Sequence, residues 1–327
     1  MDDLRTLRAW RAEVPEPGPE WVVPERRRLL TRMRERRRTL GRRLLVVGAL
    51  GTAAALAVVV LRPQPQVEVP GIVSTAPIVR LDSGVVLARA AEVAGGRESA
   101  QVPLPTQWHY TRTLDKQPNA DTTKTVEQWL RYDGRQAASY DENGDLSVGP
   151  EGDPRDPGDD DLSPQQYDAK LRALPTDPVK LLAKITADPH WIRGAREKGV
   201  PHRVPPAAIR GYHVIMLYLS RYGSMPPRLE SAMFRALALI PGVRIEQGVR
   251  DAAGRAGLGV WLETDEDRPS RRYTVLDPVT YRYWGTRTVW LRDEFLGRKD
   301  VPALPKGSVW STALVASTIV DRPGDRG

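Results

Sequence analysis

The chain has 327 residues, 40% of them hydrophobic, and its 49 Lys and Arg against 41 Asp and Glu give a formal charge of +8. This length allows one or two soluble domains, and the apolar content suffices for a packed core, which excludes a wholly disordered chain. The absence of cysteine excludes disulfides, thiolate metal sites, a cysteine nucleophile and a lipidated N-terminal cysteine.

The first predicted element is an uncharged stretch over residues 44–61. As a helix it would be ~27 Å long, close to the ~30 Å hydrocarbon thickness of a bilayer, so it predicts one transmembrane helix. Ten arginines lie between Arg26 and Arg43, which predicts a cytoplasmic N-terminus and an extracytoplasmic C-terminal domain. A cleaved signal peptide fits less well, because the charged lead-in is long and no small-residue cleavage site follows Leu61.

The Arg-rich tail, residues 1–43, carries thirteen Arg against seven acidic residues. Such a run would bind nucleic-acid phosphates without sequence preference. We expect no specific nucleic-acid partner, because no base-reading module accompanies the run, and interpret it as a topology signal beside the lipid bilayer. Within the predicted span, small-residue pairs such as Gly48 with Thr52 would allow a homodimer through the helix, although such spans are also common without dimerisation.

A Pro-rich linker is predicted over 62–76, followed by one extracytoplasmic domain over 77–327. Apolar residues at helical spacing, some after Ser or Asp caps, predict helices over 84–94 (capped by Ser83), 164–174, 178–187, 206–222 and 227–240. Strand patterns cover 107–114, 123–132, 135–140, 243–249, 258–263, 271–276, 281–291 and 309–320, and 141–161 is predicted to be a loop. Because the connecting turns are short, the strands should pair antiparallel. The fold class expected is therefore α+β, an antiparallel sheet with an inserted helical layer.

Short sequence blocks scattered over most of the chain resemble a family of actinobacterial single-pass membrane proteins of unknown function. The blocks are residues 7–17, 174–178, 226–227, 236–238, 241–243, 251–255 and 277–281. Members of this family are often encoded beside extracytoplasmic-function sigma factors. The resemblance implies a cell-envelope protein with a sigma factor or another envelope protein as partner, and it implies no reaction. The Asp-Pro-x-Thr hairpin over 277–280 also resembles the open half-barrels of lipoprotein carriers and envelope sensors.

No sequence motif indicates catalysis. The four histidines form no metal-ligand pattern, no nucleophile elbow or dinucleotide fingerprint is present, and we expect no enzyme, no cofactor, no metal site and no catalytic residue. His213 is expected to be a core residue, and His190 and His202 to be exposed. Asp141, Asn143 and Asp145 have the start of a calcium-loop spacing, but Leu146 stands where the turn glycine belongs, so a solvated loop is favoured.

Aromatic residues are concentrated in the predicted strands, among them Trp108, Trp129 and Trp261. Plain core packing explains this pattern, because aromatic residues favour strands. The alternative is an apolar groove for an acyl chain or a partner peptide, with Arg282, Arg287 and Arg292 facing an anionic headgroup or water. The sequence therefore predicts a membrane-anchored envelope protein whose exported domain binds a ligand or partner and is linked to sigma-factor signalling. The alternative is a lipid- or lipoprotein-binding half-barrel without a signalling role.

Overall fold

The computed structural model describes residues 77–118, 120–141, 143–150, 162–188, 205–221, 225–264, 268–295 and 301–327. The predicted tail (1–43), span (44–61) and linker (62–76) lie outside these residues. None of the helices described is long and apolar enough to cross a membrane. The prediction of a membrane protein with a transmembrane helix is therefore wrong for the part of the chain that the structure describes.

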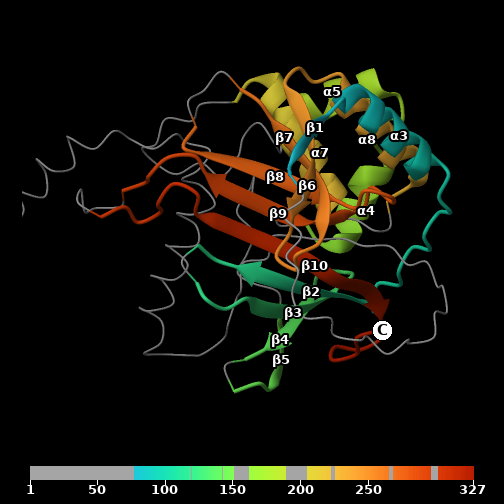
Figure 1. Ribbon diagram of the computed structural model, residues 1–327. Coiled ribbons are helices and arrows are strands. Elements are labelled where there is room, and N and C mark those ends of the chain that lie inside the picture. The colour runs from blue at the N-terminus through green and yellow to red at the C-terminus, as the bar shows by residue number, and fades with distance from the viewer. Residues whose placement is uncertain are drawn as a thin grey trace, which may run out of the picture. The chain divides into compact units, whose positions relative to one another are not determined.

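One open antiparallel sheet contains all ten described strands, in the order β1-β6-β7-β8-β9-β10-β2-β3-β4-β5 (Figure 1). The strands are β1 (Val79–Leu81), β2 (Trp108–Lys116), β3 (Lys124–Arg131), β4 (Gln136–Tyr140), β5 (Leu146–Pro150), β6 (Val243–Arg250), β7 (Ala256–Leu262), β8 (Ser270–Leu276), β9 (Tyr283–Trp290) and β10 (Val309–Val320). The last strand, β10, inserts between β9 and β2 and joins the early and late strands into one sheet. The α+β class and the antiparallel pairing predicted from the sequence are confirmed.

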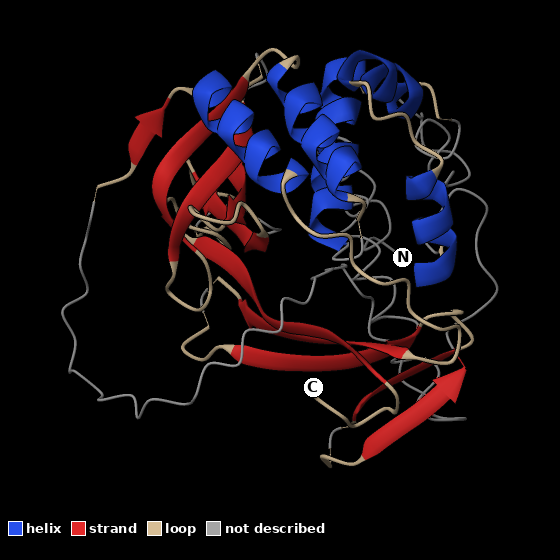
Figure 2. Cartoon of the chain, turned by 90° about the vertical axis from the view of Figure 1, so that its right-hand side faces the viewer, coloured by secondary structure: helices blue, strands red, loops and turns tan. Residues whose placement is uncertain are grey.

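Four of the five described helices gather beside the β1, β6 and β7 end of the sheet (Figure 2). They are α3 (Ser83–Gly95), α5 (Pro178–Thr186), α7 (Ala207–Arg221) and α8 (Pro227–Ala238). The fifth, α4 (Pro164–Arg172), begins at the end of β3, where Gln165 N donates to the Tyr132 carbonyl oxygen at 3.0 Å. Side chains cap α3, α4 and α5: Asp82 accepts from Val85 N, Ser163 from Gln166 N and Asp177 from Lys180 N. Such caps satisfy backbone N–H groups that have no partner within the helix.

The two faces of the sheet have different coverings, as the alternation of side chains along β7 shows. Leu258 and Val260 pack into the main core with the helices, whereas Trp261 packs with Val249 and Tyr273 in a separate cluster on the opposite face. Paired residues of antiparallel strands lie on the same face of a sheet. Val275 on β8 pairs with Gly285 on β9, Gly285 with Ala313 on β10, and Ala313 with Leu114 on β2, so the second face continues to β2. A third cluster lies there, formed by Trp108, Tyr110, Trp129, Ala138 and Val320.

Three local predictions need correction. The predicted loop over 141–161 contains β5, which pairs with β4 in a tight hairpin. The edge strand β1 was not expected, because three residues are too few to show an alternation of apolar and polar side chains. It is a strand only through its pairing with β6. The helix α3 is capped by Asp82 rather than Ser83. The first two errors concern short strands that depend on a neighbour in space, and the third is a shift of the helix start by one residue.

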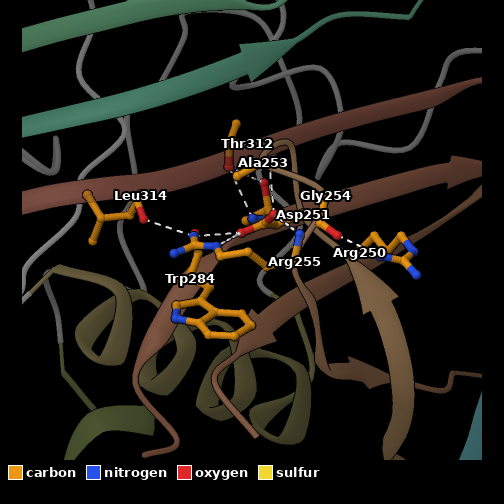
Figure 3. Close-up of polar contacts among 9 residues, drawn as sticks. Arg250, Asp251, Ala253, Gly254, Arg255, Trp284, Thr312 and Leu314 are labelled. Carbon is orange, nitrogen blue, oxygen red and sulfur yellow. Dashed lines mark hydrogen bonds and ion pairs between the residues drawn. The ribbon is translucent and has the colours of Figure 1, made fainter. Parts of the chain in front are cut away.

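The turn between β6 and β7 reaches over to β9 and β10 (Figure 3). Asp251 accepts backbone N–H bonds from Ala253 (2.9 Å) and Arg255 (3.0 Å), and its second oxygen lies 2.6 Å from Arg255 Nη2. The same guanidinium donates to the carbonyl oxygens of Leu314 (2.9 Å) and Trp284 (3.2 Å). The buried Asp251 carboxylate thus fixes the turn and orients Arg255, and Arg255 in turn connects the turn to Trp284 and to Leu314 on β10.

Candidate functional site

An apolar pocket opens between α5, α7 and the end of α8, with a volume of about 350 Å³. Small-molecule sites in proteins commonly have about 300–1,000 Å³. Short aliphatic side chains dominate the lining, which consists of Val179, Leu182, Ala183, Thr186, Ala207, Ala208, Leu239, Ile240 and Pro241.

The amphipathic pattern of α5 places one helix face in the pocket and another in the core. Leu181 and Ile185 are fully buried in the main core, while Val179 and Ala183 are exposed and line the pocket. Gly211 permits the close approach of α7 to α5, since a Cβ at this position would lie 2.7 Å from Leu182 Cδ1. This close contact lies beside the pocket, because Leu182 also belongs to the lining.

The single polar side chain of the pocket lining, Thr186, already has a partner within the protein. The Thr186 hydroxyl donates to the carbonyl oxygen of Leu182 at 2.7 Å. At the edge, Arg210 donates to the Thr186 carbonyl oxygen at 2.9 Å and to that of Pro205. A polar ligand would lose its hydrogen bonds to water in this pocket without replacing them, so the lining suits an apolar group.

Comparisons with known proteins add no assignment. No protein-family model, no curated protein and no solved structure matches the chain. The resemblance to an actinobacterial envelope family, the sigma-factor partner and the extracytoplasmic location therefore remain predictions. The pocket has to be interpreted from its own chemistry.

On the sheet face opposite the main core, the buried carboxylate of Glu246 bonds to two residues of the cluster that contains Trp261 and Tyr273. Glu246 accepts hydrogen bonds from Tyr273 Oη at 2.8 Å and Trp261 Nε1 at 3.2 Å. The Arg271 guanidinium lies 3.5 Å from Glu246 Oε1 and 4.0 Å from the centre of the Trp261 ring. Because these partners satisfy the carboxylate, we assign the network to the stability of the sheet.

The histidines lie in different settings. His213 is exposed on α7, with its ring edge-on to Tyr212 at 5.3 Å, so the prediction of a core residue is wrong. His190 and His202 lie outside the described residues. His109 is half-buried on β2, and its Nε2 lies 2.7 Å from Ser317 Oγ. Within the described residues, no three His, Asp or Glu side chains are placed to share a metal ion.

The acidic loop considered for calcium is the β4–β5 turn. Asp141 Oδ1 accepts the backbone N–H groups of Asn143 and Asp145, both at 2.9 Å, and Gly144 has a φ of 84°. The Asp141 side chain thus accepts two backbone N–H groups of the turn, a common role of Asp in turns. The 1-3-5 spacing of oxygen-bearing residues reflects turn geometry here.

Acid should destabilise the protein through His109. Burial lowers the pKa of His109 from 6.5 to about 4, so the unfolded chain binds the extra proton first and folded stability falls as the pH drops from about 7 toward 4. We expect this residue to account for about 2 kcal/mol of the loss between pH 7 and pH 4.5. Urea unfolding of the wild type and His109→Gln at both pH values checks this, and equal losses in the two proteins would contradict it.

The sequence indicated none of the residues that line the pocket as binding residues. Ala183, Ala207 and Ala208 are small aliphatic residues without functional chemistry of their own. The one usable signal was in α5, where Val179 and Ala183 lie off the core-facing stripe of Leu181 and Ile185. An exposed valine is common on a helix surface, so that signal alone identifies no site.

Proposed function

We propose that residues 77–327 form a binding domain rather than an enzyme, and that its ligand is a single acyl chain held between α5, α7 and α8. The observation that carries this proposal is the pocket of about 350 Å³ whose lining is aliphatic except for Thr186. The Thr186 hydroxyl is hydrogen-bonded to its own helix. Favourable free energy of binding in this pocket therefore comes from the burial of hydrocarbon.

The helix α5, which contributes four residues to the lining, also carries positive charge. Lys180 and Lys184 are exposed on it and could pair with an anionic headgroup outside the pocket. A fatty acid or a lipid-modified partner would present the same chemistry, a hydrocarbon chain with a polar end at the surface. The half-barrel comparison made from the sequence belongs to this proposal only as an alternative site for the chain, because among the described residues no strand residue lines the pocket between the helices.

Filling the pocket should abolish binding without unfolding the protein. We expect the full-length protein to bind a fluorescent long-chain fatty acid, and Ala208→Leu, which places three additional carbons in the pocket, to weaken binding by about tenfold or more. The readout is a fluorescence titration. The matched control is Ala169→Leu, the same change at an exposed position of α4 that does not line the pocket. Equal affinity of the two variants, or no binding by the wild type, would refute the proposal.

A further inference from the structure

The segment that follows β10, Asp321–Gly327, packs against an aromatic surface of the sheet. Figure 1 shows it as the red loop beside the end of β10. We call this surface the Glu127 shelf; its residues are Tyr110 on β2, Glu127 and Trp129 on β3, and Tyr140 on β4. The Tyr110 and Trp129 rings are stacked 4.9 Å apart, and the Tyr140 ring stands edge-on to Trp129 at 5.6 Å.

Specific polar contacts hold the segment on the shelf. Arg326 binds the Glu127 carboxylate with two nitrogens, Nε to Oε1 at 2.9 Å and Nη2 to Oε2 at 3.0 Å, and its guanidinium lies 5.8 Å from the Tyr140 ring centre. The Trp129 indole Nε1 donates to the backbone carbonyl oxygen of Asp325 at 2.6 Å. The shelf thus contacts a main-chain carbonyl and the guanidinium of the next residue, two groups that any arginine-containing peptide also carries.

Burial is unequal between the shelf and the segment. Trp129 is 0% exposed and the Glu127 side chain only 13% exposed, whereas the Arg326 side chain is 55% exposed. Asp321–Gly327 forms no helix or strand, and Gln107 anchors its start through a bond of 2.9 Å to Asp321 Oδ1. A segment with few buried apolar contacts opens at low free energy, while the sheet beneath it does not. Its departure would leave the Glu127 carboxylate, still hydrogen-bonded by Tyr110 Oη, and the Trp129 indole N–H on the aromatic surface.

We propose that the Glu127 shelf is a recognition site for an arginine-bearing extended segment of a protein partner, and that Asp321–Gly327 occupies this site in cis. The carboxylate selects a guanidinium, the indole N–H selects the preceding carbonyl, and the Tyr140 ring adds a cation–π contact. A partner segment with the same pair of groups competes with the chain's own segment for the shelf. This inference does not depend on the apolar pocket.

The test uses a fluorescein-labelled synthetic heptapeptide with the sequence of Asp321–Gly327 and the full-length protein. Arg326→Glu places a carboxylate against Glu127 and releases the cis segment, so we expect this variant to bind the peptide at least about tenfold more tightly than the wild type in fluorescence anisotropy. Arg322→Glu makes the same charge change in the same segment without a contact to Glu127, and should behave as the wild type. The double variant Arg326→Glu, Glu127→Gln should lose the increase in affinity for the peptide.

Equal binding by Arg326→Glu and the wild type would overturn the proposal, with circular dichroism confirming that the variant is folded. Hydrogen exchange in the unmodified protein provides a second criterion that needs no variant. The amides of Asp321–Gly327 must exchange much faster than those of β2 and β3, because occupation in cis requires opening without unfolding of the sheet. Protection of the segment equal to that of the strands would also overturn the proposal.

Discussion

Replacing Asp251 with Ala should cost about 2–3 kcal/mol of folding free energy, because it removes a fully buried carboxylate with charge-assisted hydrogen bonds, while the Arg255 side chain keeps 32% exposure to water. The Asp251 side chain is 0% exposed, and it accepts two backbone N–H groups as well as the Arg255 guanidinium. Without it, Arg255 would be left without its carboxylate next to the carbonyl oxygens of Leu314 and Trp284, and the β6–β7 turn would lose its internal bonds.

Equilibrium urea unfolding followed by circular dichroism measures this loss. The matched control is Glu263→Ala, which removes an exposed ion pair with Arg244 from the same hairpin and should cost less than about 1 kcal/mol. If Asp251→Ala is no more destabilised than Glu263→Ala, the turn does not depend on its buried carboxylate.

Gly285→Ala should destabilise the fold by about 3 kcal/mol, at the upper end of the range for overpacking. The φ of Gly285 is 158°, and a Cβ at this position would lie 2.1 Å from the carbonyl oxygen of Thr312. A backbone atom on the paired strand cannot rotate away as a side chain can. The clash is therefore relieved only if β9 and β10 separate where β10 joins the two halves of the sheet.

Thermal and urea unfolding of Gly285→Ala, together with hydrogen exchange of β9 and β10, tests this expectation. Gly96→Ala is the control, because its added Cβ would make only ordinary contacts, the nearest at 3.6 Å. That change should be nearly neutral or slightly stabilising, since it restricts the unfolded chain. If the unfolding midpoint of Gly285→Ala equals that of the wild type, β9 and β10 can accommodate the added Cβ without a loss of stability.

The regular elements were largely predictable, because their patterns are local. Ser163 and Asp177 with a following proline mark the starts of α4 and α5, and Asp133-Gly134 marks the β3–β4 hairpin; all three are present in the structure. The prediction failed for β1 and β5, whose few residues are strands only because β6 and β4 lie beside them. It also failed for His213, since apolar neighbours on α7 do not determine which side of the helix faces water.

Neither proposed binding site could be derived from the sequence. The pocket is lined by alanines and other aliphatic residues from α5, α7 and the turn after α8, which only the packing of the helices brings together. Glu127 and Arg326 are 199 positions apart, and nothing in either neighbourhood indicates that they meet. Contacts of this kind arise from strand order, which no local pattern specifies.

By itself the sequence determined the α+β class, the positions of the long helices and strands, and the antiparallel pairing. These properties follow from residue periodicity and from turn and cap chemistry within a few positions. The tertiary structure decided that β10 joins the early strands to the late ones, that Asp251 ties the β6–β7 turn to β9 and β10, and that Asp321–Gly327 covers the Glu127 shelf. These features depend on groups distant in sequence that share one buried space, and only packing of the whole chain brings such groups together.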